Sequence, residues 1–151
     1  QPQDLRHVFD VNVLSLFWLC RAVVPTMKQN GGGRIINLAS GAGLAGGAFA
    51  SPYHASKHAV VGLTRSLARE LAPHQIAVNA VCPGYVESPM VDRIIDGQMG
   101  VTGSEPDVLE SIPMGRMADA EEVASVVTFL ALDAPLYMTG SCLSVDGGLR
   151  A

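Results

Sequence analysis

Apolar and polar positions along this chain follow two kinds of pattern. Between residues 4 and 28, apolar side chains return at steps of three and four, which predicts a helix with one buried face. Shorter apolar runs bounded by glycine or proline indicate strands. We expect helices over residues 4–28, 51–71 and 119–132, and strands over residues 34–39, 76–82 and 141–145.

The ends of the later helices carry further signals. Ser51 and Pro52 resemble a hydroxyl cap followed by a proline in the first turn, and Pro73 marks the other end of that helix. Pro25 is expected to bend or end the first helix. Acidic residues gather in the first turn of the last helix, where the helix dipole favours them.

The order of these elements predicts the fold class. Helices and strands alternate, which is typical of an α/β domain with a doubly wound parallel sheet and helices on both faces. At this length we expect one domain over residues 1–151. Residues 85–116 form a long mixed loop, and loops of that length in a compact domain are usually functional.

Composition narrows the classes of partner. The net charge is −4 and the chain has no basic patch, which argues against nucleic-acid binding. The three cysteines are far apart, which fits reduced thiols in a cytoplasmic protein better than a disulfide framework. The apolar stretch 11–24 is interrupted by Asn12, Ser15 and Arg21, so we expect it to be too short and too polar to span a membrane.

The chemistry of the chain gathers between Ser40 and Lys57. Tyr53 and Lys57 are four residues apart on a predicted helix, so they share one face and lie roughly 6 Å apart along the axis. An ammonium near a phenol favours the phenolate, and a tyrosine tuned in this way is a proton donor and acceptor. Ser40 directly follows a predicted strand, where its hydroxyl could hold the same substrate oxygen.

These residues resemble the signature of the short-chain dehydrogenases/reductases. Ser40 is followed after twelve residues by Tyr53-His-Ala-Ser-Lys57, as in that family's Ser…Tyr-x-x-x-Lys pattern. Further segments are similar to the family in the same order along the chain; they are residues 10–13, 33–40, 78–84, 139–140 and 145–148. The resemblance implies a Rossmann-like fold and a hydride transfer between NAD or NADP and an alcohol or ketone.

The resemblance also implies a role for each catalytic position. Tyr53 would be the general acid/base and would also contact the cofactor, and Lys57 would favour its phenolate and bind the nicotinamide ribose. Ser40 would orient the substrate carbonyl, and Asn12 would position a water that links the lysine to solvent.

Further positions would contact the cofactor. Pro83 and Gly84 match the turn beside the nicotinamide, and Val86 and Ser88 match positions that contact its carboxamide. Ser88 departs from the threonine usual in the family but keeps the hydroxyl. The following loop, up to about Arg116, would cover the substrate, and its apolar side chains indicate an apolar pocket.

A second glycine-rich segment resembles a phosphate-binding loop only superficially. Residues 41–46 match G-x-G-x-x-G, but the helix signal comes later and no acid ends a following strand. The family's phosphate loop and its acid or base that selects NAD or NADP lie further N-terminal. We therefore expect the N-terminal half of the fold to be missing from this chain, and the chain alone to be inactive.

Other interpretations of the same residues remain open. An epimerase or dehydratase of the family's extended branch shares Tyr-x-x-x-Lys, and a non-catalytic oligomerisation or binding module could use the same fold. His54 and His58 have the spacing of some metal ligands, but we expect no metal there because no third ligand is evident. The expected partners are a small carbonyl or alcohol and further copies of the protein, as a homodimer or homotetramer, with neither nucleic acid nor membrane.

Overall fold

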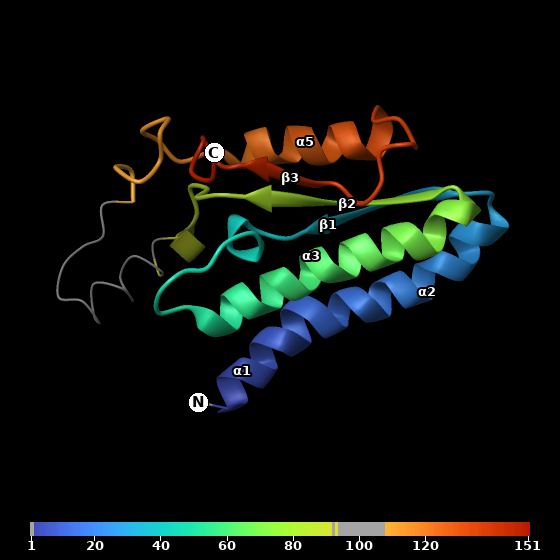
Figure 1. Cartoon of the computed structure of the whole chain (residues 1–151), viewed down its shortest axis with the longest axis horizontal. Coiled ribbons are helices and arrows are strands. Elements are labelled where there is room, and N and C mark those ends of the chain that lie inside the picture. Colours follow the sequence, from blue (N-terminus) through green and yellow to red (C-terminus); the bar gives the residue numbers. More distant parts are fainter. Residues whose placement is uncertain (1, 92, 94–107) are drawn as a thin grey trace.

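Three parallel strands form the centre of the structure, a computed structural model that describes residues 2–91, 93 and 108–151. The strands are β1 (Gly33–Leu38), β2 (Ile76–Pro83) and β3 (Cys142–Val145), in the order β1-β2-β3. Gly33 lies opposite Ile76, and Ala80 lies opposite Cys142. All three strands therefore end at the same edge of the sheet (Figure 1).

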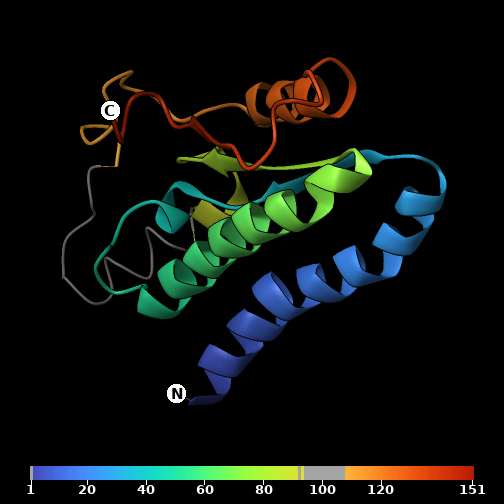
Figure 2. The ribbon, with the colours of Figure 1, turned by 45° about the vertical axis from the view of Figure 1, so that its right-hand side comes forward.

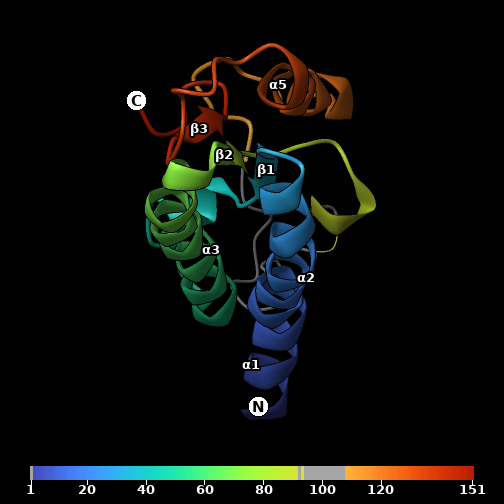
Figure 3. The same cartoon turned by 90° about the vertical axis from the view of Figure 1, so that its right-hand side faces the viewer.

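Helices cover both faces of this sheet. The first helical rod joins α1 (Pro2–Phe9), the π-helical turn η1 (Asp10–Leu14) and α2 (Ser15–Gln29). It lies beside α3 (Ser51–Leu71) on one face, while α5 (Ala120–Leu132) covers the other (Figure 3). This arrangement confirms the predicted α/β fold with a parallel sheet and helices on both sides.

Two short 3₁₀ turns complete the elements that the structure describes. One, η2 (Gly41–Gly43), directly follows Ser40, and the other, η3 (Ala72–His74), ends α3. Between η3 and β2, Gln75 adopts a left-handed conformation with φ of 57°. The observed strands and helices match the predicted ranges to within two residues at each end.

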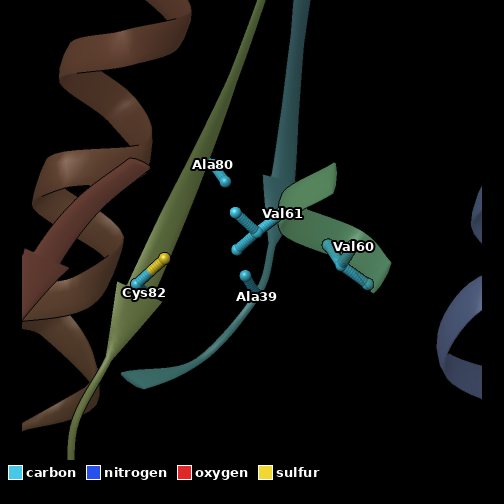
Figure 4. Close-up of a cluster of buried hydrophobic side chains, with 5 residues drawn as sticks. All are labelled: Ala39, Val60, Val61, Ala80 and Cys82. Atoms are coloured by element: carbon cyan, nitrogen blue, oxygen red, sulfur yellow. The ribbon is translucent and has the colours of Figure 1, made fainter. Parts of the chain in front are cut away.

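The central strand β2 lies in the middle of the core because helices cover both of its faces. From Ile76 to Cys82 every residue is buried, which explains why this strand reads as a continuous apolar run. One cluster joins α3 to the sheet near the candidate site, and Figure 4 shows Val61 of α3 directed toward Ala39 and Ala80; the cluster consists of Ala39, Val60, Val61, Ala80 and Cys82.

On the opposite face of the sheet, α5 is held by apolar packing and by hydrogen bonds from one arginine. Val81 of β2 packs with Leu130 of α5 in a second cluster. Arg34 of β1 donates from its guanidinium to the carbonyl oxygens of Ala131 and Ala134, at 3.4 and 2.6 Å. A cation at a helix C-terminus satisfies free carbonyls and complements the helix dipole, so Arg34 fixes α5 against the sheet.

One prediction about a helix end is wrong, and one of the two alternatives for Pro25 is excluded. Ser51 is not the N-cap of α3: Ala50 occupies that position without a side-chain bond, and Ser51 is the first helical residue. Pro25 does not end the first helix, which continues to Gln29. Pro25 and Arg21 are both exposed. The carbonyl that loses its partner to the proline can therefore bond to water.

The expectation that the first helix is too short and too polar to span a membrane is also wrong. The first rod is continuous over residues 4–29, and by length and composition this segment could cross a bilayer. Core helices of globular proteins pass the same test. The rod packs on α3 along one side, but its outer side exposes a row of large apolar residues, including Leu14, Trp18 and Leu19. Figure 2 shows its N-terminal end reaching beyond the sheet.

Candidate active site

The candidate site lies at the edge where the three strands end. Ser40 follows β1, Pro83 and Gly84 lie at the end of β2, and α3 begins at the same edge with Tyr53 in its first turn. This edge is where ligands bind in open α/β sheets. A cavity of about 420 Å³ lies instead at the opposite end of β1, around residues 30–34, and none of the predicted site residues lines it.

Ser40 is held by its own backbone turn. It has extended geometry (φ −174°, ψ 159°) and caps η2, with its Oγ accepting a 3.1 Å hydrogen bond from the Ala42 N–H. A serine hydroxyl has one proton to donate and two lone pairs. Because the bond to Ala42 uses Ser40 Oγ as an acceptor, its O–H remains a donor for a substrate oxygen.

A close approach of two backbones brings the Ser40 turn against α3. A Cβ atom on Gly43 would lie 2.6 Å from the carbonyl oxygen of Lys57. No real Cβ could occupy that position, so only glycine allows η2 to lie this near the helix. The glycines of residues 41–43 therefore form a buried turn against α3, which agrees with their exclusion as a phosphate-binding loop.

Lys57 is the best-fixed charged side chain of the site. Its Nζ donates a 3.1 Å hydrogen bond to the carbonyl oxygen of Leu38, at the end of β1. The same Nζ lies 5.7 Å from the centroid of the Tyr53 ring. Burial lowers the pKa of Lys57 below its ordinary value, and the charge of the nearby Cys82 thiolate would oppose this shift. The structure thus brings the lysine, the tyrosine and the strand that leads to Ser40 together.

Asn12 reaches the same helix from the first rod. Its Nδ2 donates a 3.0 Å hydrogen bond to Ser56 Oγ, which donates at 2.7 Å to the carbonyl oxygen of Tyr53. Asn12 lies in the π-helical turn η1, and such turns are frequent at functional sites. Ser56 is fully buried, and its part in this chain of bonds was not predicted. The only sequence signal was a small hydroxyl residue between Tyr53 and Lys57.

The histidines beside the tyrosine bond to backbone oxygens. His54 Nδ1 donates to the carbonyl of Ala45 at 2.8 Å, and His58 Nδ1 donates to that of His54 at 2.9 Å. His54 thereby ties the loop after η2 to the first turn of α3. Within residues 2–91, 93 and 108–151, no group of three or more histidine, cysteine or acidic side chains is suited to hold a metal ion.

The residues predicted to contact the nicotinamide lie at the end of β2 and directly after it. Gly84 packs against Asp146, since a Cβ there would lie 2.8 Å from the Asp146 Cβ. Val86 pairs with Ala118 in an isolated bridge, and Ser88 is half-buried. The predicted substrate lid, from about residue 86 to 116, falls largely outside the described residues.

Known proteins resemble this chain along almost its whole length. Residues 1–150 match the sequence model of a family described as enoyl-(acyl carrier protein) reductase. A D-beta-hydroxybutyrate dehydrogenase of Rhizobium meliloti is 39% identical over 96% of this chain and 58% of its own length. The 3-oxoacyl-[acyl-carrier-protein] reductase FabG of Thermotoga maritima is 39% identical over 99% and 58%, respectively.

A solved structure shows the same arrangement of elements. The acetoin dehydrogenase of Enterobacter cloacae superposes with a TM-score of 0.83 and 37% identity, over 99% of this chain and 56% of that one. The chain thus spans less than two thirds of the length of the proteins that it matches.

Proposed function

Because this chain belongs to the short-chain dehydrogenase/reductase family, we propose that the protein containing it is an NAD(P)-dependent oxidoreductase that interconverts an alcohol and a ketone. The observation that carries this proposal is the position of Lys57. Its ammonium is fixed on the Leu38 carbonyl, beside the Tyr53 ring and at the end of the strand that leads to Ser40.

Tyr53 moves the proton in this mechanism. In reduction its Oη–H donates the proton to the carbonyl oxygen of the substrate as that oxygen gains negative charge; in oxidation the phenolate takes the proton from the alcohol. The positive charge of Lys57 stabilises the phenolate at each of these steps. Burial of the lysine strengthens this interaction because the local dielectric is lower than in water.

Ser40 holds the same substrate oxygen. The Ala42 N–H fixes the hydroxyl oxygen of Ser40, which leaves its proton to donate to the substrate. A donor fixed in advance stabilises the developing oxyanion without reorganisation in the transition state. Ser40 is therefore proposed to orient the carbonyl, while Tyr53 supplies the proton.

The hydrogen-bond donors of the site fit the nicotinamide end of a dinucleotide. Lys57 has three N–H donors and uses one on Leu38, so two remain for the ribose hydroxyls of the cofactor. Pro83, Gly84, Val86 and Ser88 would border the nicotinamide ring at the end of β2. When bound, the cofactor supplies or accepts the hydride.

Asn12 is proposed to connect Lys57 with solvent through a water molecule. Its Nδ2 is engaged by Ser56, so its Oδ1 is the atom that would bind this water. Asn12 also fixes the first turn of α3 through Ser56 and the Tyr53 carbonyl. Both roles require the asparagine to stay where the π-helical turn places it.

The substrate class is proposed from what the named relatives have in common. The names of the matched proteins range from a hydroxybutyrate dehydrogenase to an acyl-carrier reductase and a hydroxysteroid dehydrogenase. Binding of a small carbonyl or alcohol is the common element, and we propose this substrate class for the present protein. We also propose a cytoplasmic location.

A second copy of the protein is proposed to cover the outer side of the first rod. Trp18 and Leu19 expose 54% and 63% of their surface there, which is unusual for large apolar side chains in one row. A homodimer or homotetramer would bury this row, as an interface between identical helices does. Sedimentation of the wild type and of a Trp18→Glu variant would test this, with dissociation expected for the variant.

We further propose that residues 1–151 form the C-terminal catalytic part of a single NAD(P)-binding domain and lack activity by themselves. In the described residues no glycine-rich loop opens directly into a helix, as pyrophosphate binding requires. The test is to express residues 1–151 and measure NAD(P)H binding and turnover. Activity equal to that of the complete protein would contradict this part of the proposal.

The proposed reaction is tested with the complete protein and a panel of ketones and secondary alcohols. Consumption of NADH or NADPH should depend on a carbonyl substrate, and Ser40→Ala should lower kcat/KM by about a hundredfold or more, as loss of one oxyanion donor does. Ser144→Ala, on the exposed side of β3, is the matched control and should leave kcat/KM unchanged. No turnover with any member of the panel would contradict the proposal.

A further inference from the structure

The hydroxyl of Ser56 lies at the centre of a chain of two hydrogen bonds between the first rod and α3. Ser56 Oγ accepts a 3.0 Å bond from Asn12 Nδ2 and donates at 2.7 Å to the carbonyl oxygen of Tyr53. Ser56 is fully buried, so water cannot replace either partner. One hydroxyl therefore connects the asparagine and the tyrosine of the candidate site.

The single proton of this hydroxyl determines which way the amide of Asn12 faces. A serine hydroxyl has one O–H and two lone pairs, whereas a carbonyl oxygen can only accept. Because Ser56 donates its proton to the Tyr53 carbonyl, it offers Asn12 a lone pair, and the asparagine must present its NH₂ group. A reversed amide would bring two acceptors together inside the protein, which costs free energy.

The amide oxygen of Asn12 is consequently the atom that stays available. Asn12 is half-buried in η1, where the Ser15 N–H bonds to the carbonyl of Asp10, five residues earlier. Within the described part of the chain, Asn12 Oδ1 has no protein partner, and it is not among the buried polar atoms that lack one. It can therefore accept a hydrogen bond from water.

A second chain of the same kind lies about two turns further along α3. Asn37 Nδ2 donates at 2.8 Å to Thr64 Oγ1, which donates at 2.8 Å to the carbonyl oxygen of Val60. Thr64 is as fully buried as Ser56, but Asn37 Oδ1 is itself buried without a partner. The two chains share their bonds, and they differ in that only the one at Ser56 leaves an amide oxygen accessible.

We propose that Ser56 is a positioning residue of the reaction, which fixes the Asn12 amide so that Oδ1 accepts from the water between Asn12 and Lys57. This inference rests on the proposed function, in which that water links the lysine to solvent. The Lys57 ammonium can only donate, so the water accepts from it and needs an acceptor for its own proton. An NH₂ group in place of Oδ1 would offer the water a second donor and interrupt the relay.

The role of the relay is to return a proton after each reduction. Tyr53 gives its proton to the substrate oxygen, and the site is ready again only when a proton from solvent has replaced it. Ser56 touches neither the substrate nor the cofactor in this account. Its loss should therefore slow turnover and leave substrate binding unchanged.

The experiment is a double-mutant cycle on the complete protein with Ser56→Ala, Asn12→Ala and the double variant. Thr64→Val is the matched control, because it also removes one buried hydroxyl from an asparagine–hydroxyl–carbonyl chain of α3. The substrate is the ketone that the wild type reduces fastest among acetoin, ethyl acetoacetate and cyclohexanone, with saturating NADH or NADPH. The measurements are kcat, KM, the solvent deuterium isotope effect on kcat and thermal unfolding.

We expect Ser56→Ala to lower kcat by about tenfold, less than the hundredfold or more that a direct proton donor contributes, with KM unchanged. Alanine favours a helix, so α3 should stay folded. Asn12→Ala should lower kcat equally, and the double variant no further, since the serine acts through the asparagine. The isotope effect should rise in these three variants, because return of the proton becomes the slow step.

The control separates this role from a loss of stability. Thr64→Val should lower the unfolding temperature about as much as Ser56→Ala, while kcat and the isotope effect stay at their wild-type values. An equal fall in kcat in Thr64→Val would assign the effect to stability and overturn the inference.

Three further results would overturn the role of Ser56. They are a wild-type kcat in Ser56→Ala, a rise in KM in place of the fall in kcat, and losses that multiply in the double variant. In each of these cases the proposed oxidoreductase activity still stands. If the wild type reduces none of the ketones, the proposed function fails, and the inference about Ser56 fails with it.

Discussion

The ammonium of Lys57 donates a 3.1 Å hydrogen bond to the carbonyl oxygen of Leu38, nineteen residues earlier in the chain. This bond joins the helix that carries Tyr53 to the strand that leads to Ser40. A lysine fixed in this way cannot move freely into solvent, so its charge stays beside the tyrosine ring. The effect of Lys57 on catalysis therefore depends on this contact.

Removing the charge of Lys57 should impair proton transfer and cofactor binding together. Lys57→Met is expected to lower kcat/KM by about a hundredfold or more, within the range typical of general acid–base contributions. It should also raise the dissociation constant for the cofactor, since the ribose donors are lost. Kinetics and fluorescence titration of NAD(P)H on the complete protein measure both. A variant with normal cofactor affinity would contradict the ribose contact.

The bond between Asn12 and Ser56 should stabilise the first turn of α3. In Asn12→Ala the buried Ser56 loses its donor, which should lower the free energy of unfolding by about 1 kcal/mol, as is typical of a hydrogen bond. Urea unfolding measures this change. The control is Val11→Ala, an exposed neighbour on the same turn, with a smaller expected effect. Equal losses in the two variants would show that the bond is not important for stability.

Cys82 should make the protein less stable in alkali. Burial raises the pKa of this thiol to about 11, and the nearby Cys142 contributes in the same direction. The unfolded chain releases the thiol proton at about pH 8.5. The folded state is therefore favoured fully below that pH and progressively less up to about pH 11.

Thermal unfolding of wild type and Cys82→Ala between pH 7 and 10.5 tests this prediction. The variant should be less stable at neutral pH, because it leaves a cavity beside Val61 and Ala39. Its Tm should nevertheless fall less steeply above pH 8.5 than that of the wild type. Parallel Tm curves over the whole range would contradict the assigned role of the thiol.

Much of the fold could be predicted from periodicity because the pattern and the structure have the same physical cause. β2 is buried on both faces and so reads as an uninterrupted apolar run. α3 has a proline in its first turn and another just beyond its last. These signals are local, and the elements that they mark occupy the predicted ranges.

The features that were missed have no distinct signal in the local sequence. The π-helical turn around Asn12 has no distinct composition, because one extra residue in a turn leaves the apolar pattern almost unchanged. Continuation of the first helix through Pro25 depends on solvent at its exposed side. Arg150 packs against Gly41, which lies far from it in the sequence, and neither residue indicates this contact alone.

The residues of the candidate site fall into the same two groups, those with a local sequence signal and those without one. Ser40, Tyr53 and Lys57 could be singled out because the spacing of the last two is helical and the first follows a strand. Ser56 and the Leu38 carbonyl could not, since a small hydroxyl residue on a helix does not by itself indicate a buried hydrogen bond and a backbone oxygen has no sequence signal. Both contribute by holding the side chains that were predicted.

Turnover by a Tyr53→Phe variant of the complete protein is the most direct test of the proposed mechanism. The substitution removes only the phenolic oxygen, so the fold should be retained, as circular dichroism can verify, and NAD(P)H titration separates a loss of cofactor binding from a loss of proton transfer. We expect kcat to fall by about a hundredfold or more, since Tyr53 is the proposed donor of the proton. A variant that reduces ketones as fast as the wild type would contradict the assignment of Tyr53. Absence of turnover in the wild type as well would indicate a non-catalytic protein.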